Sequence, residues 1–207
     1  MSSTVVLEPI VKALPDPRAR VTGVVYLSYF LAAILAQLLL GRNFVGYGTA
    51  INLVATGCYI ALTLLFYGMF EPVDRTLSSL AALCSLAGCI VMSLGFFPRT
   101  TLPFSPMLFF GPYCLLIGYL IFRSTFLPHI LGVLMACAGV GWLAYLSPGV
   151  AHSLNLYIKI LGIFAEAALM LWLIIMGVNI TQWKSRRRLH SILRTRKERK
   201  DEHCSND

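Results

Sequence analysis

Charged side chains are scarce in this chain. Only 13% of its 207 residues are charged, whereas 57% are hydrophobic. A soluble domain carries about a quarter charged residues, so the composition excludes an ordinary soluble globular protein. It indicates a membrane protein, and the length allows one bundle of about six spans.

Signatures of metal binding and catalysis are also missing. The sequence has no HExxH motif, no two cysteines spaced as CxxC and no cluster of two carboxylates. Its four histidines lie in predicted loops or near the C-terminus, which argues against a haem held between helices. We therefore expect no cofactor and no metal, and a membrane enzyme is the least favoured function.

Long apolar segments are what the sequence has in abundance. They are continuously apolar, without the alternation that a barrel strand needs, and therefore predict helices. The fold class that follows is an all-α integral membrane bundle of six transmembrane helices, with both termini on the same side. Pro112 falls inside the fourth segment, where it predicts a kink. The six segments are residues 21–40, 50–70, 77–97, 107–122, 130–146 and 154–178.

The basic residues predict how the chain is oriented and divided, because lysine and arginine collect on the cytoplasmic side. The loops alone are nearly balanced, but nine of the seventeen basic residues lie between Lys184 and Lys200. We therefore expect a cytoplasmic N-terminal segment (1–20), a six-helix domain (21–183) and a basic cytoplasmic tail (184–207) in a bacterial inner membrane. The first apolar segment is too long for a cleaved signal peptide and should remain as the first span.

The basic tail carries a second pattern. Leu189, Ile192 and Leu193 follow helical spacing among basic residues, which is typical of an amphipathic helix on an anionic lipid surface. A solvated anchor that only fixes topology is the alternative. Nucleic-acid binding is poorly supported, because no aromatic residues alternate with the charges. The candidate lipid-facing residues are Arg186, Arg187, Arg188, Arg194, Arg196 and Lys197.

Glu166 is the only acidic residue in any predicted span. A charge at this depth costs roughly 3 kcal/mol on insertion scales, so the residue should have a partner or a purpose. Gly162 and Lys159 share its helical face, with Lys159 roughly 10 Å away along the axis. Glu166 and Lys159 are thus a candidate in-membrane polar site. Glu166 is either a proton or cation site or a clamp between helices, and we favour the clamp.

Two further groups of residues lie at predicted helix ends. Arg75 and Arg123 are candidate interfacial anchors that would pair with nearby acids or contact lipid phosphates. At the opposite ends, several polar residues either line a shallow vestibule or occupy ordinary interfacial positions, and we favour the second interpretation. Small residues on the fifth span predict close helix packing; they are Gly132, Ala136, Gly139 and Gly141.

Three stretches of sequence carry a family resemblance. Residues 72–77 are PVDRTL, residues 118–124 are GYLIFRS followed by LPHILG at 127–132, and Glu166 precedes LWL at 171–173. From about residue 18 to 182, the chain resembles a bacterial family of six-helix membrane proteins, catalogued as domain of unknown function 4386. It departs from that family in having Asp74 where asparagine is common, and in its long basic tail. The resemblance implies a fold and a compartment, but no activity.

The favoured function is a non-enzymatic scaffold or accessory protein that binds lipid or partner subunits. The alternative is a small-molecule or proton-coupled carrier that uses Glu166. The expected partners are the lipid bilayer, anionic lipid at the tail, and further subunits in a homo- or hetero-oligomer.

Overall fold

The computed structural model describes residues 17–96, 105–124 and 126–177. All regular structure in these residues is helical, which confirms the all-α prediction. The predicted basic tail and the first sixteen residues lie outside the described residues. The elements are α2 (Pro17–Gly41), α3 (Val45–Phe70), α4 (Arg75–Leu94), α5 (Met107–Arg123), α6 (His129–Leu143), the short 3-10 helix η1 (Ala144–Leu146) and α7 (Pro148–Ile175).

Five of these helices are long and apolar enough to cross a membrane: α2, α3, α4, α6 together with η1, and α7. The helix α5 has 17 residues, about 25 Å at 1.5 Å per residue, which is shorter than a hydrocarbon layer of about 30 Å. Large apolar side chains remain exposed around the bundle, as expected of a surface that faces lipid. The described residues therefore form a membrane bundle with five evident spans.

Local sequence explains where the helices begin and end. Asp74 caps α4, because its side chain accepts a hydrogen bond from the Leu77 N–H at 3.1 Å. Pro148 is the first residue of α7, where its missing N–H costs nothing. Beyond the other end of α7, Gly177 has a φ of 64° and its N–H bonds the Trp172 carbonyl at 3.1 Å. Glycine adopts this left-handed backbone without a steric penalty.

Helix boundaries differ from the predicted segments at several places. The helix α3 begins at Val45 instead of residue 50, and α7 begins at Pro148 instead of residue 154. The apolar run marks only the part in hydrocarbon, whereas the backbone hydrogen bonds continue into polar residues until a cap or a turn ends them. Pro112 lies inside α5, which is one helix from Met107 to Arg123.

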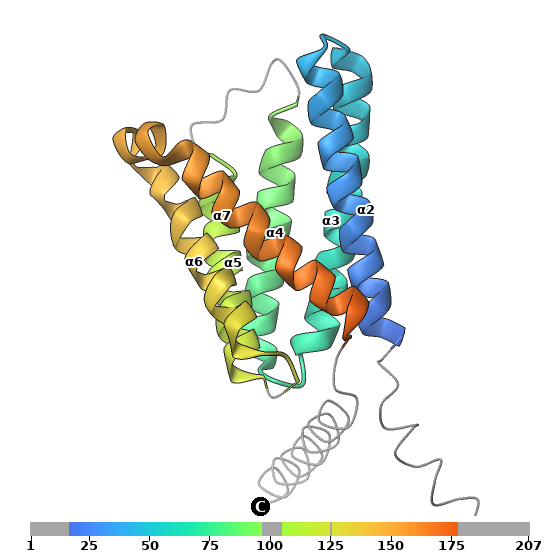
Figure 1. Ribbon diagram of the computed structural model, residues 1–207, viewed down its shortest axis with the longest axis vertical. Coiled ribbons are helices and arrows are strands. Elements are labelled where there is room, and N and C mark those ends of the chain that lie inside the picture. The colour runs from blue at the N-terminus through green and yellow to red at the C-terminus, as the bar shows by residue number, and fades with distance from the viewer. Residues whose placement is uncertain (1–16, 97–104, 125, 178–207) are drawn as a thin grey trace, which may run out of the picture.

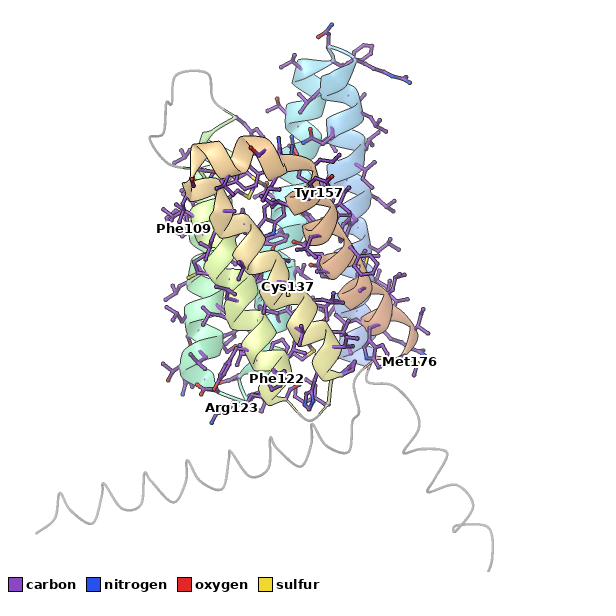
Figure 2. The ribbon with its side chains drawn as sticks, turned by 60° about the vertical axis from the view of Figure 1, so that its left-hand side comes forward. Phe109, Phe122, Arg123, Cys137, Tyr157 and Met176 are labelled. Atoms are coloured by element: carbon purple, nitrogen blue, oxygen red, sulfur yellow. The ribbon has the colours of Figure 1, made fainter. Side chains whose placement is uncertain are left out.

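Consecutive helices run antiparallel and pack against each other, from α2 and α3 to α6 and α7 (Figure 1). The helix α7 closes the bundle, since it crosses obliquely from α6 and η1 to α2 (Figure 1). The start of α2 and the end of α7 consequently lie at the same end of the bundle, which we call the lower end. Figure 2 shows Arg123 and Met176 near this end, and Phe109 and Tyr157 towards the other.

The helices α5 and α6 approach most closely, through facing glycines. A Cβ on Gly118 would lie 2.7 Å from the Gly132 carbonyl oxygen and 2.8 Å from the Ala136 nitrogen. A Cβ on Gly139 would lie 2.9 Å from the Gly111 carbonyl oxygen. The two backbones therefore touch without intervening side chains. This confirms the close packing predicted for Gly132, Ala136 and Gly139, and it adds two partners on α5 that the sequence analysis did not identify.

Candidate functional site

Glu166 lies in the second half of α7, where this helix approaches α2. The hydroxyl group of Tyr26, on α2, donates a hydrogen bond to its carboxyl group. Surrounding protein removes most water from that carboxyl group, although the residue keeps a partly exposed surface. The only acidic group in the predicted spans is therefore tied to the first span by a side-chain hydrogen bond.

Four tyrosines from three helices lie in the neighbourhood of this carboxyl group, and we call them the tyrosine cluster: Tyr26 and Tyr29 of α2, Tyr59 of α3 and Tyr113 of α5. Each of them has an electrostatic interaction with Glu166. The ring centroid of Tyr59 is 4.8 Å from that of Tyr29 and 6.1 Å from that of Tyr113. A side-chain hydrogen bond also joins Tyr59 and Tyr113. The carboxyl group of α7 thus has tyrosines of α2, α3 and α5 in its neighbourhood, and Tyr26 of α2 is hydrogen-bonded to it.

Polar side chains continue from the tyrosine cluster towards α4. The hydroxyl oxygens of Thr63 and Ser85 are 2.6 Å apart, and Ser85 also forms a hydrogen bond with the thiol of Cys89. Cys89 in turn interacts electrostatically with Tyr29 and Tyr113. Within the described residues, every buried side-chain nitrogen or oxygen has a hydrogen-bond partner. The polar interior is therefore satisfied and spread over five helices.

Lys159 is exposed on α7. Seven residues of helix separate it from Glu166, roughly 10 Å along the axis. The two ion pairs found among the described residues lie elsewhere. Gly162 lies between Lys159 and Glu166 on the same face of α7, and the indole ring of Trp142 from α6 covers it. The structure brings Glu166 to Tyr26 and places Lys159 apart from this pair.

Both predicted anchor arginines stand at the lower end of the bundle beside acidic residues. Arg123 Nη1 lies 2.8 Å from Asp74 Oδ2, which joins the end of α5 to the start of α4. Arg75 Nε lies 3.7 Å from Glu71 Oε1, one turn away. The side chains of both arginines are about half exposed, at 51% and 54%, so each pair contributes little to stability. The predicted contact with lipid phosphates stays a prediction.

The polar residues that the vestibule hypothesis concerns are exposed except for Asn52; they are Gln37, Arg42, Asn43, Asn52, Asn155 and Lys159. Asn52 is buried on α3, and Thr56 one turn later donates to its carbonyl oxygen at 2.9 Å. Asn155 of α7 accepts a hydrogen bond of 2.6 Å from the Tyr145 hydroxyl group. Gln37 and Asn43 are exposed on α2 and the turn after it.

Sequence analysis missed the tyrosine cluster, although a signal was present. Tyrosine in membrane helices is enriched at the two interfaces, where its hydroxyl group meets water. Tyr26, Tyr29, Tyr59 and Tyr113 instead lie away from the ends of their helices. Tyrosines at that depth, together with a lone carboxylate, indicate an internal polar cluster.

No group of three or more histidine, cysteine, aspartate or glutamate side chains able to hold a metal ion is found in the part of the chain that the structure describes. The six candidate lipid-facing residues of the tail lie outside that part. The site that the structure does assemble is Glu166 with the tyrosine cluster.

No curated protein and no solved structure matches this chain. One family model does match, and its description is Domain of unknown function (DUF4386). The match spans residues 102–177, which hold α5, α6 and α7 with Glu166. Two of the three stretches that carried the resemblance fall inside these residues, and the stretch 72–77 falls outside. Through residues 102–177 the chain matches the family of domain of unknown function DUF4386, as its sequence predicted.

Proposed function

We propose that this protein is a non-enzymatic scaffold or accessory protein of the membrane, which binds lipid or partner subunits. The observation that carries the proposal is the hydrogen bond between Glu166 and Tyr26. It ties α7 to α2, the last described span to the first, and so closes the bundle. Hydrogen bonds between polar side chains of neighbouring helices are one of the interactions that hold membrane bundles together.

The packing of the bundle supports the same proposal. The backbones of α5 and α6 touch at two pairs of glycines, and Trp142 fills the space beside Gly162. Close-packed interiors transmit strain and change shape at a cost. A rigid bundle suits a protein that presents a fixed surface to lipid or to other subunits.

A carrier that uses Glu166 is the second candidate, and one observation favours it. The carboxyl group has neutral neighbours in the tyrosine cluster, and the residue keeps a partly exposed surface. An acidic group with no cationic partner among the residues described here is suited to exchange a proton or bind a cation.

Substitution of Glu166 separates the two candidates. In E166Q the side-chain oxygen still accepts the Tyr26 hydrogen bond, whereas E166A leaves the hydroxyl group without its partner. If the protein is a scaffold, E166Q should give a folded yield in detergent near that of wild type. E166A should be less stable by about 1 kcal/mol and give a lower folded yield. Wild type, E166Q and E166A should all show no proton flux in liposomes.

E71Q is the matched control, because Glu71 lies at the lower end of the bundle outside the spans. A wild-type flux that E166Q abolishes, while E71Q retains it and both proteins fold, would reject the scaffold proposal in favour of the carrier.

The membrane topology is part of the proposal. We infer six spans, with α5 as the short one, and both termini in the cytoplasm of a bacterial cell. Burial supports counting α5 as a span: its side chains pack between α4 and α6, so protein and not lipid surrounds much of it. A helix lined by protein need not match the thickness of the bilayer.

A further inference from the structure

Lys159 is a basic residue on the outer surface of the bundle. It is exposed on α7, within the candidate span Ser153–Ile175. Neither of the two ion pairs among the described residues includes it, because both join arginines to acidic residues at the lower end. A charged side chain in hydrocarbon is costly, so a basic residue in a span calls for an anionic partner.

The hairpin of α2 and α3 shows how deep Lys159 lies. At the end of the bundle opposite the lower end, the upper end, this hairpin rises beyond the corner formed by η1 and the start of α7 (Figure 1). Its upper half is apolar and faces outward, with Leu35 and Leu38 46% and 58% exposed, so lipid should reach almost to the turn at Arg42. Figure 2 places Tyr157 well below that turn, and Lys159 follows on a helix that descends. Lys159 therefore lies at the level of the apolar, lipid-facing part of the hairpin.

A second polar side chain lies on the same face, one turn closer to the upper end. Asn155 is exposed four residues before Lys159, and its Oδ1 accepts a hydrogen bond of 2.6 Å from the Tyr145 hydroxyl group. Its amide NH2 group carries two donors. Helical side chains lean towards the N-terminus of their helix, which is the upper end of α7, so the lysine leans towards Asn155. An ammonium and an amide placed in this way suit the oxygens of a phosphate group.

Apolar side chains continue this exposed surface below Lys159. Ile160 is 56% exposed, and Ile163, one turn deeper than Lys159, is 57% exposed. Lipid acyl chains pack against an apolar surface of this kind. The exposed side of α7 thus matches a molecule with an anionic head and an apolar tail.

The charges of the described residues favour a head of net negative charge. Arg42 and Lys159 are basic and lie above the lower end, whereas Glu71 and Asp74 lie at the lower end and Glu166 lies further down α7. A headgroup that carries its own cation would place that cation in a positive potential. Charge complementarity therefore selects an anionic phospholipid over a zwitterionic one.

We propose that Lys159, with Asn155 beside it, binds the phosphate group of an anionic phospholipid of the phosphatidylglycerol class. The acyl chains lie along Ile160 and Ile163. The headgroup sits lower than those of the surrounding bilayer, at the step between the α2–α3 hairpin and the corner of α7. A second copy of the chain fits less well, because its described carboxylates Glu71 and Asp74 already pair with arginines.

The inference rests on the proposed function and deepens it, because it names the lipid that the scaffold binds. The two fail separately. A protein that shows no preference for phosphatidylglycerol and no proton flux remains a scaffold. A flux that depends on Glu166 rejects the scaffold and leaves the lipid preference to its own measurement.

Photolabelling of the full-length protein in phosphatidylcholine vesicles tests the proposal. The probe is a trace of phosphatidylglycerol with a diazirine in its acyl chain, and mass spectrometry locates the labelled peptides. We expect this probe to label residues 156–163 about fivefold more than a phosphatidylcholine probe with the same chain. The exposed face of α3 around Val54, a helix without charged residues, should be labelled equally by both probes. Equal labelling of residues 156–163 by the two probes would overturn the proposal, and this comparison needs no substitution.

Substitutions assign the preference to the lysine. K159M removes the ammonium and keeps an unbranched side chain, so the phosphatidylglycerol probe should label residues 156–163 no more than the phosphatidylcholine probe does. K159R keeps the charge and should retain the preference, and N155A should weaken it by a smaller factor. R20Q is the matched control, because Arg20 is exposed near the start of α2 at the lower end, and it should behave as wild type does. A folded K159M protein with the wild-type preference would contradict the site.

Other occupants would give different results. A second copy on this face would shield residues 156–163 from both probes and would appear as a dimer in native mass spectrometry that K159M dissociates. Free phosphate as the ligand would appear as competition by inorganic phosphate against the phosphatidylglycerol probe. Either result would overturn the assignment to a phospholipid.

Discussion

At the scale of single residues, glycine sets how closely helices approach. Gly118 faces backbone atoms of α6, whereas Gly57 on α3 faces outward, with nothing within 4 Å of an added Cβ. We predict that G118A forces α5 and α6 apart and destabilises the protein by about 1–3 kcal/mol. G57A, the matched control, should be neutral or slightly stabilising, because alanine has the higher helix propensity. The thermal midpoint of detergent-solubilised protein checks both, and a G118A protein as stable as G57A would contradict the glycine contact.

At the scale of elements, one side chain both begins α4 and connects it to α5. Asp74 caps α4 through the Leu77 N–H and pairs with Arg123 at 2.8 Å. We predict that D74A lowers stability by about 1 kcal/mol through the lost cap. D74N should lose only part of this stability, because an asparagine side chain can also cap a helix. Chemical or thermal unfolding in detergent measures the difference, and D74N as unstable as D74A would assign the effect to the ion pair instead.

At the scale of the whole molecule, the basic tail should decide the orientation. The loops are nearly balanced in charge, and nine of seventeen basic residues lie between Lys184 and Lys200. We predict that a green fluorescent protein fused after Asp207 is fluorescent, because it folds in the cytoplasm, and that a fusion after Trp183 reports a mixed orientation with a weaker signal. Whole-cell fluorescence, normalised to the amount of fusion protein, measures this. Equal signals from the two fusions would show that the tail does not set the topology.

The sequence by itself determined that this is an all-helical membrane protein, and it located Glu166, the small residues of α6 and the family resemblance. These properties depend on composition, on continuous apolar length and on local spacing, all of which follow directly from the order of the residues. Helix ends were less predictable, because a cap such as Asp74 or a turn glycine such as Gly177 ends a helix independently of its apolar run.

Only the tertiary structure decided what Glu166 contacts. The sequence offered Lys159 as a neighbour on the same helix, but the oblique course of α7 places Glu166 beside Tyr26 of α2. Glu166 and Tyr26 lie 140 positions apart in the sequence. No local pattern encodes such a contact, because it depends on the way in which α7 crosses the bundle and on the close approach of helices at their glycines.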